Sequence, residues 1–412
     1  MAKKNFIIWK WVTVIVNLSK KSTFVWWTPV FLFLITLLST LFFAHNEIYG
    51  EATRATQEPL ATAAVEKINL TAVGDVLMHM PVVNSTYDPK SKSYDFRSIF
   101  AYLQPELFSA DIAVGVLETT LNCPDKAFTG YPSFNSPKEI AAGLQWAGID
   151  LLFTAQNHTF DFGFPGIKST LDALDELAMP STGTWREPTQ KRYYIMEAKG
   201  IKLAFISVTT FLNKPIPKDK KWACNLLYYE QIKTDILAAR VEGADGIVVA
   251  LHVGTEYERI PSKAQQEIAD KLFELGVDII LGSHVHVIQP YELRQVVSPF
   301  TNEVRNCFVV HSLGNLISNQ RWRYSDAGLL VNLEIEKIPG KQAINVVAVN
   351  HAPLWVDTFL EKGKRYYRVV KVVGSEVPPE LQLDAKRKKR YGEVWQETAE
   401  LFDKWNAGKQ KE

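Results

Sequence analysis

From Ile68 onward, short apolar runs alternate with segments of helical period, and this alternation narrows the fold class more than any other feature. The runs are short enough to be buried strands. They read INLTAVGD, DIAVGVLE, GIDLLFTAQNH, IKLAFISVT, DGIVVALH, VDIILGSH and CFVVHSLGN. Runs that are apolar nearly throughout are typical of strands covered on both faces. The sequence therefore predicts an α/β layered domain.

Two of the intervening segments carry signals for the start of a helix. In one, Glu139 follows Ser136 by three residues, and in the other Gln265 follows Ser262 by three. This spacing predicts a capping box, in which each side chain bonds the other residue's backbone N–H. We therefore expect helices over residues 136–147 and 262–275, each followed by a glycine that ends it.

The pattern changes after about residue 327. The stretch GLLVNLEIEKIPGKQAINVVAVNH predicts a β-hairpin around Pro339-Gly340, followed by a charged helix over 384–405. The run KRKKR at 386–390 has two readings. It could attract an anionic lipid or polymer, or it could be an ordinary solvated helix face.

The first residues have a different character. The run from Phe24 to Ala44 carries no charge and is long enough to cross a bilayer, which takes about 20 residues. Lysines precede it, which places the N-terminus in the cytoplasm and the rest of the chain outside. The alternative is a secretory signal peptide, but the small-x-small cleavage pattern is missing, so we favour an uncleaved anchor.

The chain thus divides into four parts: a cytoplasmic tail and transmembrane anchor (1–45), a polar linker (46–67), the main domain (68–325), and a C-terminal hairpin and helix that complete it (326–412). The formal net charge is +1, so no overall field favours nucleic acid. Cys123, Cys224 and Cys307 form no C-x-x-C pair. A cysteine zinc site or a disulfide scaffold is therefore not expected.

Side chains that bind metals lie at the end of five of the apolar runs. They are Asp75, Glu118, Asn157 with His158, His252, and His284 with His286. Strand ends form the ligand-binding crevice of layered α/β domains. Imidazole, carboxylate and amide groups together suit zinc, manganese or iron. The H-x-H pair alone is a weak signal, but the ordered set indicates a metal site.

These residues carry a family resemblance. The motifs are VGDVLMH, VGVLET, NHTFDFG, LHVGTEY, GSHVHVIQPYE and SLGN at 312–315. As an ordered set they resemble the calcineurin-like metallophosphoesterase superfamily and, more closely, its CapA branch, the bacterial poly-γ-glutamate capsule biosynthesis proteins. The resemblance covers about residues 68–320. It implies a metallophosphatase-like, four-layer β-sandwich flanked by helices, with an N-terminal transmembrane helix.

The resemblance also implies roles for individual residues. Asp75 and His286 would hold one divalent ion, with Glu118 as a bridge to a second. Asn157, His252 and His284 would hold that second ion. His158 would donate a proton to the leaving group, Asp161 would orient His158, and Glu256 would accept a hydrogen bond from an imidazole. The ions would be manganese, iron or zinc.

Two positions depart from the wider superfamily, and the CapA branch shares both departures. Leu77 stands where most members have a histidine, and the histidine of this motif is His79, two residues later. His79 could bind a metal, contact substrate or simply be a hydrogen-bonded polar residue. Glu118 stands where many members have aspartate. Together the two departures favour the CapA branch and weaken the inference that ordinary phosphoesterase chemistry persists.

The expected protein is a single-pass membrane protein that acts with a capsule polymer synthase and membrane export partners, and does not bind nucleic acid. Three classes of function stay open. The domain could be an active dinuclear hydrolase of a phosphoester, an accessory subunit whose metal site supports polymer synthesis or export, or a binding domain with a degenerate site.

Overall fold

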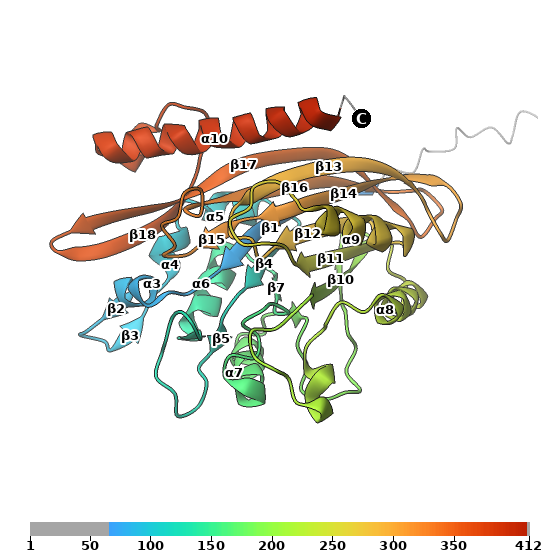
Figure 1. Cartoon of the computed structure of the whole chain (residues 1–412), viewed down its shortest axis with the longest axis horizontal. Coiled ribbons are helices and arrows are strands. Elements are labelled where there is room, and N and C mark those ends of the chain that lie inside the picture. Colours follow the sequence, from blue (N-terminus) through green and yellow to red (C-terminus); the bar gives the residue numbers. More distant parts are fainter. Residues whose placement is uncertain (1–65, 410–412) are drawn as a thin grey trace, which may run out of the picture. The chain divides into compact units, whose positions relative to one another are not determined.

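Two large β-sheets lie face to face in residues 66–409, the part of the chain that the computed structural model describes (Figure 1). The first is eight-stranded, with β15 (Asn315–Ile317) lying beside β1. Its other strands, in order, are β18 (Lys364–Lys371), β17 (Ile344–Glu361), β16 (Ala327–Lys337), β1 (Lys67–Val76), β4 (Ile112–Leu117), β7 (Leu151–Phe153) and β8 (Ser181–Thr182).

The second sheet is six-stranded and has a parallel centre. Its strands, in order, are β13 (Ile288–Val297), β14 (Val304–Leu313), β12 (Ile279–Ser283), β11 (Gly246–His252), β10 (Ile201–Thr209) and β9 (Tyr194–Ala198). Two small ribbons pair β2 (Tyr87–Asp88) with β3 (Ser93–Tyr94), and β5 (Thr120–Leu121) with β6 (Asn135–Ser136).

Helices α3 to α9 cover the outer faces of the two sheets. The helices are α3 (Met80–Ser85), α4 (Arg97–Phe100), α5 (Gln104–Phe108), α6 (Glu139–Ala147), α7 (Gly163–Glu176), α8 (Tyr229–Val241), α9 (Lys263–Glu274) and α10 (Ala385–Lys409), with short 3₁₀ turns at Lys218–Ala223 and Pro379–Leu381. Figure 1 shows α10 lying along β17 and β13 rather than on an outer face.

The core has three layers of apolar contacts because successive strand residues point to opposite faces. On β10, Leu203 and Phe205 join the cluster between the sheets, whereas Ala204 and Ile206 join the cluster beneath α8 and α9. A third cluster lies between the first sheet and helices α4 to α7. Helix, sheet, sheet and helix thus form four layers, as the resemblance implied.

The predicted strands and the C-terminal elements are confirmed. Each of the seven apolar runs contains a strand. The hairpin around Pro339-Gly340 is the β16–β17 pair, in which Leu333 lies opposite Val349. Because β16 also pairs with β1, this hairpin extends the first sheet. The charged helix is α10.

One of the two predicted capping boxes is wrong. Ser262 and Gln265 form the box at the start of α9. Ser136, however, belongs to β6, and its hydroxyl lies 2.7 Å from that of Thr119. Helix α6 begins three residues later, at Glu139, without a side-chain cap. The Ser136 hydroxyl bonds to Thr119, a residue from another part of the fold, and is therefore not available to cap a helix.

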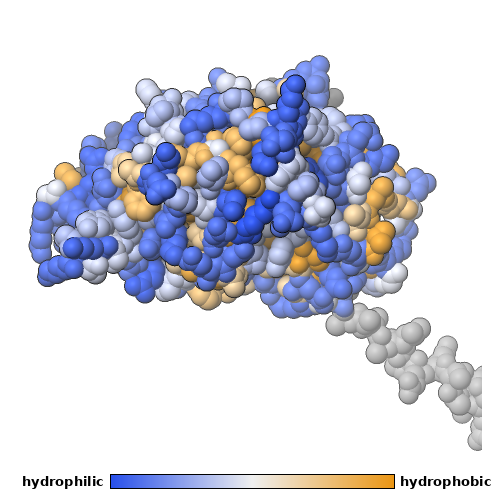
Figure 2. All heavy atoms as spheres, turned by 90° about the horizontal axis from the view of Figure 1, so that it is seen from below, coloured by the Kyte–Doolittle hydropathy of each residue, from blue (hydrophilic) through white to orange (hydrophobic). Residues whose placement is uncertain are grey.

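The predicted transmembrane segment, residues 24–44, lies outside the described residues. Within residues 66–409, no helix is both long and apolar enough to span a bilayer. The face seen in Figure 2 is largely hydrophilic, with hydrophobic residues gathered near its centre and toward one edge. Exposed apolar residues of this kind are normal on a folded domain.

Candidate metal centre

The predicted metal ligands converge at one end of the sandwich, because the strands that carry them end there. Asp75 lies near the end of β1, Glu118 directly follows β4, and Asn157 follows β7. The second sheet supplies three histidines from the ends of β11 and β12: His252, His284 and His286. All six side chains are at most 3% exposed. Each sheet therefore supplies half of the set.

A close backbone approach positions Asp75. The pairing of β1 with β4 shifts register between Ala72 and Asp75, and such a bulge re-aims the following side chain. At Gly74, a Cβ atom would lie 1.9 Å from the carbonyl oxygen of Gly314, so only glycine fits. The Asp75 N–H donates to that same carbonyl at 2.9 Å.

The H-x-H segment has an unusual backbone. His284 has φ 94° and His286 has φ 61°, in a region that residues other than glycine rarely adopt. Each such residue costs about 1–3 kcal/mol, and such residues cluster at functional sites. Val285 between them is fully buried. The strained turn thus directs both imidazoles inward while its middle residue anchors it in the core.

Two groups of ligand atoms form, and they share one residue. In each group, one atom from every residue lies within 4.8 Å of the others. The groups are Glu118 with His252 and His284, and Asp75 with Glu118 and His286. Asn157 belongs beside the first group, since its Oδ1 is 2.9 Å from Nε2 of His252. This partition is the one that the resemblance implied.

Several polar atoms in the cluster are buried without a hydrogen-bond partner among the described residues. They are Oδ1 of Asp75, both carboxylate oxygens of Glu118 and Nδ1 of His284. Buried polar atoms in folded proteins nearly always have a partner, because leaving one without a partner costs free energy. Oxygen and nitrogen atoms facing a common point suit a divalent cation. The residues present therefore fit the implied metal ions.

The electrostatics of the cluster favour positive charge. Burial lowers the pKa of His252 to about 3 and that of His284 to about 2, so both rings are neutral ligands at pH 7. Burial raises the pKa of Glu118 to about 8. Although burial opposes it, the carboxylates of Glu118 and Asp75 raise the pKa of His286 to about 9.

A neighbouring hydroxyl orients His252: its Nδ1 lies 2.8 Å from the Ser283 hydroxyl, which leaves Nε2 to the cluster. Nδ1 of His286 lies 3.2 Å from Oδ1 of Asn315 and 3.4 Å from Oδ2 of Asp75, so this atom faces the cluster. Glu256 was expected to accept a hydrogen bond from an imidazole, but the partner of His252 is Ser283. Glu256 lines the cavity beside the cluster instead.

His158 and Asp161 form a second unit next to the cluster. Nδ1 of His158 lies 2.8 Å from Oδ2 of Asp161, which also accepts the N–H of Phe134 at 2.7 Å. The side-chain amide of Asn213 lies 3.3 Å from Nε2 of His158. With Nδ1 committed to the carboxylate, Nε2 is the atom available for proton transfer. The motif NHTFDFG indicated the first two residues, whereas no local pattern indicated Asn213.

A cavity of about 880 Å³, here called the metal-side cavity, opens beside these groups. His158 and His286 line it, together with Tyr257, Arg321 and Trp322. His79, whose role the sequence left open, also lines it. Its Nδ1 accepts the N–H of Asn319 at 3.3 Å, and neither ligand group includes it. His79 is thus placed to contact a bound molecule.

Comparison with known proteins decides the family. The family described as "Bacterial capsule synthesis protein PGA_cap" matches residues 69–320, more than half of the 412-residue chain. The chain belongs to this family. All six proposed ligand residues of this PGA_cap protein lie within the matched range.

The names of two curated relatives agree with the description of the family. The chain is 25% identical over 324 residues to "Capsule biosynthesis protein CapA" of Bacillus anthracis, covering 74% of each protein. It is 26% identical over 290 residues to "PGA biosynthesis protein CapA" of Bacillus subtilis (strain 168), covering 69% of this chain and 72% of that one.

Solved structures give weaker similarities. A calcineurin-like phosphoesterase, YfkN from Bacillus subtilis, aligns with a TM-score of 0.42 and 16% identity over 70% of this chain and 90% of that chain. A 5'-nucleotidase precursor from Thermus thermophilus aligns with a TM-score of 0.43 and 14% identity. That alignment covers 81% of this PGA_cap protein but only 59% of the nucleotidase.

Proposed function

We propose that this PGA_cap protein acts in the synthesis or export of a capsule polymer, poly-γ-glutamate, through a domain that binds two divalent metal ions. The apolar segment 24–44 would anchor it in the cell membrane, with residues 66–409 on the outer side. Its partners would be the polymer synthase and membrane export proteins. The family and the names of both curated relatives support the assignment to capsule synthesis.

The observation that carries the metal-binding part is the position of Glu118. Its carboxylate belongs to both ligand groups and is fully buried, and within residues 66–409 neither of its oxygens has a hydrogen-bond partner. A buried carboxylate with both oxygens free is costly unless a cation neutralises it. Divalent cations held by Glu118 together with the other residues of the two ligand groups would satisfy this carboxylate.

A second candidate function is hydrolysis of a phosphoester. His158 lines the same cavity as His286, and its contact with Asp161 gives a geometry that suits general acid catalysis. Two bound metal ions would supply charge stabilisation and an activated water in such a reaction. His158 would hold the transferable proton at Nε2, and the carboxylate of Asp161 would stabilise the cationic ring.

Metal content tests the first proposal. The full-length chain, purified in mild detergent, should bind about two manganese, iron or zinc ions per chain by elemental analysis. Glu118→Gln should lower the occupancy of both ions, because the neutral amide offers only one oxygen and no charge. Glu267→Gln, an exposed site on α9, is the matched control and should keep wild-type occupancy. Two ions retained in Glu118→Gln would show that the bridge is wrongly assigned.

Turnover separates the two candidates. A generic phosphodiester should be hydrolysed by the metal-loaded protein, and not by His158→Ala, if the domain is an active hydrolase. If the domain is an accessory subunit, metal occupancy should be full, a broad substrate panel should show no turnover, and cells carrying Glu118→Gln should produce less capsule polymer. Normal polymer production in those cells would contradict a role in capsule synthesis for the metal site.

A further inference from the structure

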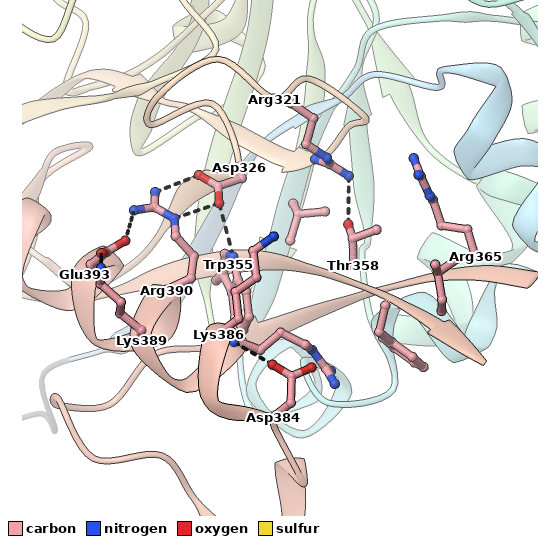
Figure 3. A pocket seen from close by; sticks show the side chains of 14 residues that line it. Arg321, Asp326, Trp355, Thr358, Arg365, Asp384, Lys386, Lys389, Arg390 and Glu393 are labelled. Atoms are coloured by element: carbon pink, nitrogen blue, oxygen red, sulfur yellow. Dashed lines mark hydrogen bonds and ion pairs between the residues drawn. The ribbon is translucent and has the colours of Figure 1, made fainter. Parts of the chain in front are cut away.

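A second cavity, of about 920 Å³, lies between the β17–β18 hairpin and the first turns of α10 (Figure 3). It is rich in positive charge and is here called the basic cavity. Its cationic lining residues are Arg321, Arg365, Lys386, Arg387, Lys389 and Arg390. Four of these come from the KRKKR run, so one side of that run faces the basic cavity.

The acidic residues of the basic cavity already have partners. Asp326 accepts two hydrogen bonds from Arg390, at 2.8 and 2.9 Å. Asp384 accepts the backbone N–H of Arg387 at 2.9 Å, at the start of α10. Glu393 lies 3.3 Å from Arg390. Arg387 and Lys389 are paired as well, Arg387 with Asp357 and Lys389 with Glu393 at 3.6 Å.

The other three lining cations have no carboxylate partner among the described residues. Among residues 66–409, no carboxylate lies within 4.0 Å of the side-chain nitrogens of Arg321, Arg365 or Lys386. Arg365 and Lys386 are exposed. Arg321 donates a hydrogen bond to the Thr358 hydroxyl at 2.7 Å, which holds its guanidinium at the cavity wall (Figure 3). Such a cavity attracts anions, and guanidinium groups match carboxylates in shape.

Arg321 lines the metal-side cavity as well as the basic cavity, so the two cavities meet at this residue. Each has a volume near the upper end of small-molecule sites, which run to about 1,000 Å³. A ligand that fills both must be longer than a small molecule. It must also carry anionic groups at more than one point.

We propose that the basic cavity binds successive carboxylates of a linear polycarboxylate while a neighbouring segment of the same polymer lies in the metal-side cavity. Arg321 would contact the polymer where it passes from one cavity to the other. The choice of a polycarboxylate rests on the proposed function in capsule synthesis. The binding site itself rests on Arg321, Arg365 and Lys386. A formal charge of only +1 on the whole chain gives no general attraction for polyanions, so binding depends on this local cluster.

The test is binding of fluorescein-labelled poly-γ-glutamate to the full-length chain in mild detergent, measured by fluorescence anisotropy. The double variant Arg365→Gln/Lys386→Gln should raise the dissociation constant at least about tenfold, which corresponds to losing one good charge-assisted contact. The matched control, Lys263→Gln/Lys404→Gln, removes the same charge from exposed sites on α9 and α10 and should stay within about twofold of wild type. Arg321→Gln is a second variant that should also weaken binding.

Equal binding by the double variant and its control would overturn the proposal. Polyphosphate of matched length is the second arm. If it bound more tightly than the labelled polymer and lost binding in the double variant, the polycarboxylate assignment would be wrong. Metal content is measured on the same samples. If these preparations contained no metal and the double variant alone still lost polymer binding, the metal-centre proposal would be contradicted and the polymer-binding proposal would stand.

Discussion

At the scale of single residues, Asp161 shows how one carboxylate serves two neighbours. It accepts hydrogen bonds from Nδ1 of His158 and from the backbone N–H of Phe134. For the hydrolase alternative, Asp161→Asn should reduce turnover about 10- to 100-fold, the usual cost of losing a partner that orients an imidazole. Metal content should not change, because Asp161 belongs to neither ligand group. Asp175→Asn, an exposed site on α7, is the control.

Metal content distinguishes positioning from a structural defect. If Asp161→Asn lost bound metal together with turnover, the variant would be structurally damaged, and the positioning role of Asp161 would not be supported.

Which site residues the sequence revealed depends on where they lie. Asp75, Glu118 and the three histidines of the second sheet were predictable, because each ends an apolar run that had to be a strand. Ser283 lies on a strand end too, but serine there is too common to signal a role. Asn213 and Arg321 come from loops, and only the tertiary fold brings them to the site.

At the scale of secondary-structure elements, Glu292 on β13 joins three elements. His311 on β14 lies 3.2 Å from its carboxylate, Arg294 on β13 lies 2.9 Å away, and Lys409 at the end of α10 lies 3.7 Å away. Burial alone would raise the pKa of Glu292, but hydrogen bonds from His311 and Arg294 lower it to about 2. The carboxylate is therefore bound more favourably in the folded state than in the unfolded one.

This predicts a pH-dependent contribution to stability. A folded pKa below the unfolded value of 4.5 gives stability that is fully present above about pH 4.5 and is lost as the pH falls toward 2. Glu292→Gln should therefore cost about 1–2 kcal/mol at pH 7, after allowing for solvent screening, and nothing near pH 2. Thermal unfolding at several pH values measures this difference. Glu274→Gln, an exposed site on α9, should show no such trend, and a constant difference in Glu292→Gln would contradict the assignment.

The elements themselves were largely predictable because buried strands require unbroken apolar runs. What the runs did not reveal is how strands from different parts of the chain pair. The C-terminal hairpin lies next to β1 although more than 250 residues separate them, as in the pair Leu70–Leu333. Ser136 failed as a helix start for the same reason, since its partner, Thr119, is distant in sequence.

At the scale of the whole described domain, the metal centre lies where the two sheets meet. Asp75 and Glu118 extend from the first sheet, and His252, His284 and His286 extend from the second. Bound ions would connect the sheets through direct bonds and neutralise the buried carboxylates. Metal binding should therefore be coupled to folding, because the unfolded chain cannot bring these residues together.

The thermal midpoint should depend on metal. A ligand at 100 to 1,000 times its dissociation constant stabilises the folded state by about 3–4 kcal/mol. For a domain of this size, that corresponds to a rise of about 4–6 °C relative to chelator-treated protein. Glu118→Gln should lose most of this rise. Its chelator-treated midpoint should stay at or above that of wild type, because the amide replaces a carboxyl group whose ionisation burial opposes. If wild type melted at the same temperature with and without manganese or zinc, the two sheets would not be joined by metal, and the cluster would need another explanation for its unpartnered oxygens.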